Sequence, residues 1–179
     1  FALLPLLVVL AGCSPEDGEV RDSAVPADSE AEDTASVDTG AIDSGAIDTL
    51  RGKPLVIVAL QLPADSQFAL YSPFESNQQF IDFVAAAVRE VAPDAALLFK
   101  RHPMDASNDR LPAGARWVEG NLARFDAARP VVVCINSTVG FESLVRGLRV
   151  VCFAPSFYAD APALVHASPE DFRERLRAV

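Results

Sequence analysis

VVVCINSTVGFESLVRG, residues 131–147, decides the fold, because a buried strand, a polar loop and a helix follow one another directly. Val131 to Ile135 forms an apolar run, as expected of a strand covered on both faces of a sheet. The polar residues after it are Asn136, Ser137 and Thr138. Each of the three can cap a helix, and the helical segment from Val139 to Arg146 stops at Gly147. A strand that feeds straight into a helix predicts an α/β fold.

Strands and helices are predicted to alternate on both sides of residues 131–147. The sequence predicts further strands at residues 55–60, 95–99, 116–118 and 150–153, and helices at 80–91, 122–128 and 170–177, the last capped by Ser168. The segment from Gln61 to about Glu75 is interpreted as a polar loop. Together these elements predict a doubly wound, mostly parallel, Rossmann-like sheet with helices on both faces.

Unusual polar residues follow four of the predicted strands. Gln61 follows the first, Lys100–Pro103 the second, Asn136–Thr138 the next buried one, and Pro155–Tyr158 the last. Ligands of such sheets bind outside the carboxyl ends of the strands. We therefore expect the four loops to open on one edge of the sheet and to form a binding site there.

An anion is the ligand that this edge suits best. The free N–H groups and the positive end of the helix after Thr138 favour a negative group, although an ordinary N-cap would give the same sequence. Pro103 biases His102 to an extended backbone, so a histidine held beside the helix can donate to a phosphate. Lys100 and Arg101 add charge, but cations at a strand end are commonly just solvated. No GxxxxGK run is present, so the phosphate loop of nucleoside triphosphatases is not indicated.

Two further polar residues, Asp65 and Glu142, have two interpretations each. Asp65 is either a turn former or a carboxylate that acts as nucleophile or base. Glu142 is either a surface residue or a ribose ligand. Cys134 and Cys152 lie in apolar runs, where free cysteine packs as a small hydrophobe. No zinc-ligand spacing is present, and no metal or tightly bound cofactor is expected.

The net charge of -10 is confined to the N-terminal segment, since residues 50–179 contain as many acidic as basic residues. A neutral folded part gives no indication of nucleic-acid binding. Residues 14–50 are rich in acidic and small residues and predict a disordered linker.

Residues 1–13 predict a signal segment. Phe1–Leu10 is apolar but too short to span a bilayer, and LAGC at 10–13 resembles a bacterial lipobox, which implies lipidation at Cys13. If this signal is genuine, the protein is a membrane-anchored lipoprotein of the cell envelope. Otherwise we expect it at the cytoplasmic periphery of the inner membrane.

Four segments together resemble the capsule polysaccharide biosynthesis family, which includes Kdo transferases. They are QLPADSQFALYSPF (61–74), KRHP (100–103), NSTVGFESL (136–144) and FAPSFYADAP (153–162). The resemblance covers residues 53–179 and implies the nucleotide-binding half of a two-domain GT-B glycosyltransferase, so that residues 51–179 form a CMP-sugar-binding domain. It implies CMP-Kdo as donor, a lipid or glycan as acceptor, and a further N-terminal GT-B domain as partner.

The resemblance also implies roles for individual residues. His102 with Pro103, and Ser137 with Thr138, would hold the CMP phosphate, and Lys100 would neutralise charge as CMP leaves. The Q-x-x-x-D element falls on Gln61 and Asp65, which makes Asp65 the candidate carboxylate at the anomeric carbon. Asn136 and Glu142 complete the expected donor site.

An exported chain and a cytoplasmic CMP-sugar are in conflict. One alternative is a non-catalytic surface lipoprotein that keeps a degenerate nucleotide-sugar-binding domain. A second is a lipoprotein start joined to a transferase segment, and a third is an apolar start that is no export signal. The sequence leaves all three open.

Overall fold

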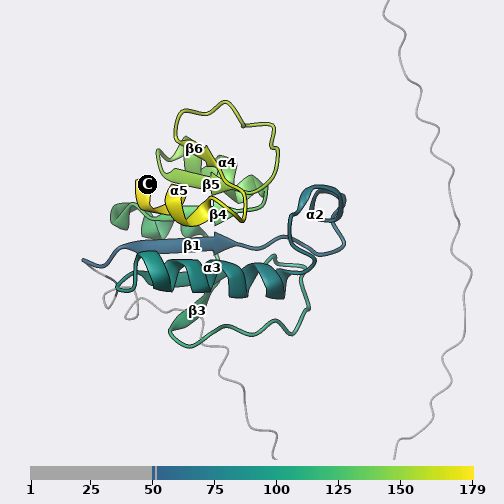
Figure 1. Cartoon of the computed structure of the whole chain (residues 1–179), viewed down its shortest axis with the longest axis horizontal. Coiled ribbons are helices and arrows are strands. Elements are labelled where there is room, and N and C mark those ends of the chain that lie inside the picture. The colour runs from purple at the N-terminus through teal and green to yellow at the C-terminus, as the bar shows by residue number, and fades with distance from the viewer. Residues whose placement is uncertain (1–49, 51) are drawn as a thin grey trace, which may run out of the picture. The chain divides into compact units, whose positions relative to one another are not determined.

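The computed structural model describes residue 50 and residues 52–179, and in this part the chain folds into a six-stranded sheet flanked by helices (Figure 1). In chain order the elements are β1 (Leu55–Ala59), α2 (Ser66–Tyr71), α3 (Asn77–Val91), β2 (Ala96–Lys100), β3 (Ala115–Val118), the 3₁₀ helix η1 (Leu122–Ala128), β4 (Val131–Cys134), α4 (Thr138–Val145), β5 (Arg149–Cys152), β6 (Leu164–His166) and α5 (Phe172–Ala178).

The strand order is β3-β2-β1-β4-β5-β6, and every neighbouring pair is parallel. The chain thus winds outward from β1 in one direction and from β4 in the other, which is the Rossmann order. This confirms the predicted α/β, Rossmann-like, doubly wound fold. The direction reverses between β1 and β4, so the ligand crevice of such a sheet is expected at the carboxyl ends of these two strands.

Each face of the sheet has its own apolar core, which explains the continuous apolar runs. In β1, Val56 and Val58 pack on one face with Phe80 and Val84 of α3. Ile57 packs on the other face with residues of η1, β4 and β5. A strand that is covered on both sides has no position at which a polar side chain would reach water.

Two short elements were not predicted from the sequence. Helix α2 lies within the segment interpreted as a loop and buries only Phe68, so it has no amphipathic pattern to detect. Strand β6 has three residues, none of them buried. In Figure 1, α2 lies beyond the arrowhead of β1, at the carboxyl edge of the sheet.

The last helix begins later than predicted. Ser168 and Pro169 lie in a turn, and α5 starts at Phe172, with Asp171 at its N-cap position. Ser168 Oγ accepts from the Asp171 N–H group (3.4 Å), and Asp171 Oδ1 accepts from the Ser168 N–H group (2.7 Å). Ser168 therefore caps the turn that precedes α5, and not the helix as predicted, because Asp171 holds the N-cap position.

The signal segment 1–13 with Cys13, and the linker 14–50 apart from Leu50, lie outside the described residues. Leu50 itself is partly buried and packs against the core that contains Ile57. Among the residues described, no helix combines the length and the apolar character needed to cross a membrane.

Candidate functional site

Two adjacent pockets open at the carboxyl edge of the sheet. The α4 pocket, of ≈ 720 Å³, is lined by the ends of β1 and β2, the turn before η1 and one side of α4. The α2 pocket, of ≈ 510 Å³, is lined by Gln61, Asp65, Asn136 and the loop Pro155–Phe157, among others. All four loops that were expected to meet at one edge therefore do so.

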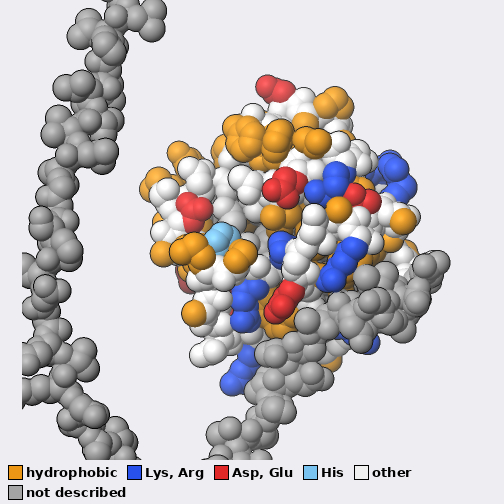
Figure 2. All heavy atoms as spheres, turned by 180° about the vertical axis from the view of Figure 1, so that it is seen from behind, with side chains coloured by type: hydrophobic (Ala, Val, Ile, Leu, Met, Phe, Trp, Pro, Cys, Tyr) orange, Lys and Arg blue, Asp and Glu red, His pale blue; other side chains and the backbone are white. Residues whose placement is uncertain are grey.

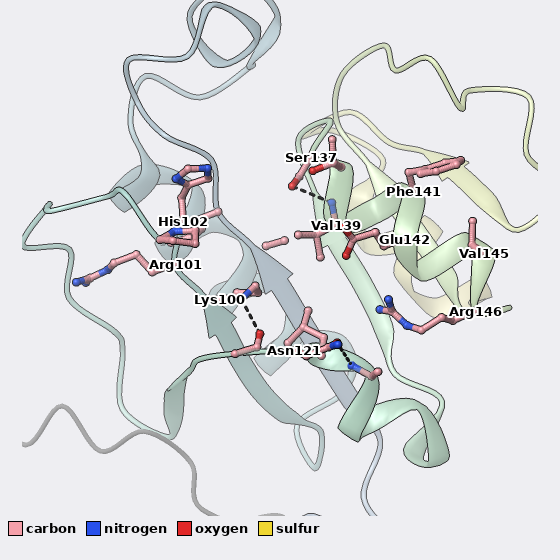
Figure 3. Close-up of a pocket in the computed structure, with 17 residues that line it drawn as sticks. Lys100, Arg101, His102, Asn121, Ser137, Val139, Phe141, Glu142, Val145 and Arg146 are labelled. Atoms are coloured by element: carbon pink, nitrogen blue, oxygen red, sulfur yellow. Dashed lines mark hydrogen bonds between the residues drawn. The ribbon is translucent and has the colours of Figure 1, made fainter.

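His102, Ser137 and Thr138 line both pockets and so mark the boundary between them. They come from the loop after β2 and from the junction of β4 with α4, on either side of β1 in the sheet. In Figure 3, His102 lies on one side of the α4 pocket and Ser137 on the other. The sequence had singled out these three residues for a phosphate, and the fold brings them together.

Ser137 is the N-cap of α4. Its side-chain oxygen accepts from the Val139 N–H group (3.2 Å), and its carbonyl accepts from the Gly140 N–H group (2.9 Å). A capped first turn holds its N–H groups in fixed directions, and the helix dipole adds partial positive charge there. The capping and anion-binding interpretations of Asn136–Thr138 are therefore compatible, with Ser137 as the cap.

His102 begins a tight turn. Its carbonyl accepts from the Asp105 N–H group (2.9 Å), and its ring Nδ1 accepts from the Met104 N–H group (3.2 Å). Pro103 occupies the second position of this turn, which suits its fixed φ. A ring that accepts at Nδ1 carries its single proton on Nε2. The turn thus leaves Nε2–H as the donor of the histidine.

The α4 pocket is lined by Lys100 of β2, by Arg101 in the loop after it, and by Glu142 and Arg146 of α4 and its C-cap (Figure 3). Lys100 ends β2, and its Nζ donates to the Gly120 carbonyl (2.8 Å), which leaves two of its three donor positions for other partners. Glu142 is exposed on α4. Arg146 binds Asp126 of η1 (3.2 Å) and Ser143 (3.2 Å) and so ties α4 to η1.

Asp65 lies in the α2 pocket and caps α2. Its Oδ1 accepts from the Gln67 N–H group (2.9 Å), and the side chain is partly exposed. The structure thus shows the turn-forming role of Asp65 and places its carboxylate beside the shared residues of both pockets. Its predicted catalytic role stays a prediction.

Gln61 is buried, and its amide bridges the two central strands. Its Nε2 donates to Asn136 Oδ1 (2.9 Å), and its Oε1 accepts from the Asn136 backbone N–H group (3.1 Å). Both polar atoms of this amide are therefore occupied by Asn136. The geometry gives Gln61 a positioning role, and its predicted catalytic role stays a prediction.

Asn77 extends this bridge to the histidine turn. Its Nδ2 donates to the Gln61 carbonyl (2.8 Å) and approaches Asp105 Oδ2 (3.4 Å), at the end of the turn that His102 begins. We call Gln61, Asn77, Asp105 and Asn136 the carboxyl-edge network. It connects the loops that follow β4, β1 and β2, and so fixes the two sides of the site relative to each other.

No functional role was predicted for Asn77 from the sequence. It lies one turn before Phe80 and Ile81, on the buried face of α3, and is itself buried. An amide on the apolar face of an amphipathic helix requires polar partners, because an unpaired amide would be costly to bury. The position of Asn77 on the buried face of α3 was therefore the feature of the sequence from which its role could have been predicted.

Tyr158 packs beneath the start of α4. Its hydroxyl donates to the Ser137 carbonyl (2.6 Å) and lies 3.6 Å from Cys152 Sγ and 3.9 Å from Cys134 Sγ. The two thiols, 3.4 Å apart, are register partners at the ends of β5 and β4. Both are free and buried, in agreement with their prediction as core residues.

Ionisation of Tyr158 and Cys152 is disfavoured. Burial, reinforced by the neighbouring thiols, raises the pKa of the Tyr158 hydroxyl above its ordinary value. The hydrogen bond to Cys134 and burial likewise raise the pKa of the Cys152 thiol. The tyrosine therefore remains a neutral hydrogen-bond donor at physiological pH.

The large exposed hydrophobic side chains of the described residues gather around this site. They are Leu70 and Tyr71 of α2, Met104 after the histidine, Phe141 and Val145 of α4, and Phe157 after β5. On the face shown in Figure 2, hydrophobic side chains form patches at the top and on the left, and acidic and basic side chains are interspersed between them. In the part of the chain that the structure describes, no group of three or more His, Cys, Asp or Glu residues could hold a metal ion.

A family model described as "Capsule polysaccharide biosynthesis protein" matches residues 34–177. The chain belongs to this family. The predicted resemblance is thus confirmed, and the match begins within the segment that was interpreted as a linker.

Two curated proteins are similar in sequence to part of this chain. Protein FixF of Sinorhizobium fredii is 33% identical over 109 residues, which are 58% of this chain and 27% of FixF. The capsule polysaccharide modification protein LipA of Neisseria meningitidis serogroup A is 28% identical over 125 residues, which are 60% of this chain and 16% of LipA. The matched chain spans about a quarter or less of these relatives.

Two solved structures share the fold. The beta Kdo 2,7 transferase of Thermosulfurimonas dismutans KpsC superimposes with a TM-score of 0.52 at 25% identity, over 66% of this chain and 39% of that one. The beta Kdo 2,4 transferase of the same KpsC gives a TM-score of 0.54 at 20% identity, over 73% and 42%. The match therefore covers less than half of either transferase.

Proposed function

We propose that residues 51–179 bind a CMP-sugar and form the donor half of a glycosyltransferase that transfers Kdo or a related sugar in capsule polysaccharide biosynthesis. The acceptor would be a lipid or a glycan. The observation that carries this proposal is the pair of pockets that share His102, Ser137 and Thr138.

A nucleotide sugar has its phosphate between its nucleoside and its sugar. The two pockets meet at His102, Ser137 and Thr138, which can donate hydrogen bonds to a phosphate. The pockets therefore match this order. The larger α4 pocket would take the nucleoside, with Glu142 as candidate ribose ligand. The α2 pocket would take the sugar, and Asp65 lines that pocket.

The same arrangement suits the chemistry of transfer. When the bond between the anomeric carbon and the phosphate oxygen breaks, negative charge grows on the departing CMP. His102 Nε2–H, Lys100 and the start of α4 would stabilise that charge. Asp65 would act at the sugar, either by taking the proton of the acceptor hydroxyl or as a nucleophile.

The test is a titration of the full chain with CMP, followed by the NMR shifts of the backbone amides of Ser137 and Thr138. Saturable shifts are expected for CMP, and smaller ones for cytidine, which lacks the phosphate. The proposal fails if millimolar CMP leaves both amides unmoved.

The lipobox-like LAGC at residues 10–13 favours a second candidate, a non-catalytic lipoprotein of the cell envelope that only binds glycans or nucleotides. Incubation of the chain with CMP-Kdo and membrane glycolipid acceptors distinguishes the two. Release of CMP that depends on the acceptor supports the transferase, while a diacylglyceryl group on Cys13 together with binding of CMP without transfer supports the lipoprotein.

A further inference from the structure

Tyr158 is the buried titratable residue that the proposed chemistry does not use, although it contacts the site directly. It lies in the loop after β5, 21 residues beyond Ser137, and donates to the Ser137 carbonyl at 2.6 Å. Only 6% of its surface is exposed. Ser137 is in turn the cap of α4 and lines both pockets.

The bond to the Ser137 carbonyl determines where the next N–H group points. In a planar trans peptide, the carbonyl of one residue and the N–H of the next point in opposite directions. The Ser137 carbonyl is held toward Tyr158 and Gly140. The Thr138 N–H group therefore points away from Tyr158 and from the first turn of α4, and Thr138 itself lines both pockets.

Tyr158 has room beneath α4 because residue 140 of this helix is a glycine, which has no side chain. A Cβ atom added at Gly140 would lie 2.7 Å from the Tyr158 hydroxyl and 3.0 Å from Cys134 Sγ. Gly140 has no positive φ, so backbone conformation does not require glycine here. Glycine is required at this position because the Tyr158 hydroxyl approaches it so closely.

We propose that Tyr158 is a positioning residue of the anion site, whose hydroxyl holds the Ser137–Thr138 peptide so that its N–H group faces the phosphate. The inference rests on the proposed function, since the phosphate is that of the CMP-sugar. Tyr158 touches no substrate in this arrangement and acts only through the peptide.

The experiment compares wild-type full chain with Tyr158→Phe, which keeps the ring and removes the hydroxyl. Dissociation constants for CMP and cytidine are measured by calorimetry, and the Thr138 amide is followed by NMR. CMP affinity should fall roughly three- to tenfold, as expected for one lost hydrogen bond. Cytidine affinity should stay within about twofold, and the CMP-induced shift of the Thr138 amide should shrink.

The outcomes separate this inference from the proposed function. Equal CMP affinities in the two proteins overturn the positioning role alone. Equal losses for CMP and cytidine also overturn it, because they show a general effect on folding. A wild-type chain that binds no CMP removes the proposed function and this inference together.

Gly140→Ala provides an independent variant if Tyr158→Phe does not fold. It keeps the hydroxyl but forces it to move, because of the 2.7 Å contact. The same selective loss of CMP affinity is expected. A folded Gly140→Ala protein that binds CMP as tightly as wild type contradicts the proposal.

Discussion

At the scale of single residues, His102 and Asp65 each perform a local structural task that leaves part of the side chain for a ligand. His102 uses Nδ1 to accept from Met104 within its own turn. Asp65 uses Oδ1 to cap α2. Measurements on variants must therefore separate the loss of the structural hydrogen bond from the loss of the hydrogen bond to the ligand.

His102→Ala should weaken CMP binding by about 1 kcal/mol, or roughly fivefold, because a neutral ring donates one hydrogen bond from Nε2. A charged ring would be worth about 1.5–3 kcal/mol, but it could not accept at Nδ1. Stability should change little, since the side chain is only partly buried. Calorimetry with CMP and thermal melts measure the two effects.

The matched control is His166→Ala, since His166 is exposed on β6 and lines neither pocket. It should leave CMP affinity unchanged. A large drop in the melting temperature of His102→Ala with unchanged CMP affinity would show that the histidine is structural and the phosphate site misassigned.

Asp65→Asn should lower the rate of sugar transfer by about 100-fold or more while leaving CMP affinity and stability nearly unchanged. Asparagine caps a helix as well as aspartate, so α2 keeps its N-cap and only the charge is lost. The rate is read from CMP release with CMP-Kdo and acceptor. Asp82→Asn, in an exposed residue of α3, is the control. A wild-type rate in Asp65→Asn removes the carboxylate from the mechanism.

At the scale of elements, the carboxyl-edge network joins β1, β4 and α3 at the point where the sheet reverses direction. Gln61 and Asn136 are 75 residues apart in the chain, yet they form a two-bond pair. Parallel strands are held by their backbone ladders up to Ala59 and Cys134. The amide pair continues the connection into the loops, where no ladder exists.

Gln61→Leu should reduce the free energy of unfolding by about 1–3 kcal/mol, because the partly buried side chain and N–H group of Asn136 lose their partner. Gln67→Leu is the control: it too removes a bond to Asn136, of 3.1 Å, but at an exposed site, and should cost well under 1 kcal/mol. Urea denaturation of both variants measures the difference. If both variants lose the same free energy of unfolding, burial of the Gln61–Asn136 pair does not contribute to stability.

At the scale of the whole molecule, the LAGC motif and the proposed donor site indicate different compartments. CMP-sugars are cytoplasmic, whereas a lipidated Cys13 would place the chain outside the inner membrane. We expect the native protein to carry a diacylglyceryl group on Cys13 and to partition into the detergent phase of Triton X-114. Cys13→Ser should move it to the aqueous phase.

Mass spectrometry of the N-terminus in the native host is the corresponding direct measurement. A chain that keeps unmodified Cys13 within a longer N-terminal segment contradicts lipidation. That outcome would remove the conflict with a cytoplasmic donor and leave the transferase proposal unaffected.

The sequence by itself determined the fold class and the location of the site. Each buried strand was detectable because cover on both faces excludes polar residues, as in residues 55–60 and 131–135. Helix α3 was detectable because its apolar residues repeat at helical spacing. The polar residues after each strand then had to share one edge, because parallel strands have their carboxyl ends on the same side.

Only the tertiary structure decided the strand order, the Gln61–Asn136 pair and the contact of Tyr158 with Ser137. These depend on which segments become neighbours across long stretches of chain, and no local pattern encodes that. Short α2 and β6 were missed because they bury too few side chains to leave a periodic signal. The resemblance assigned the phosphate to residues of two loops, His102 with Pro103 and Ser137 with Thr138, but only packing decides which N–H groups face the same point.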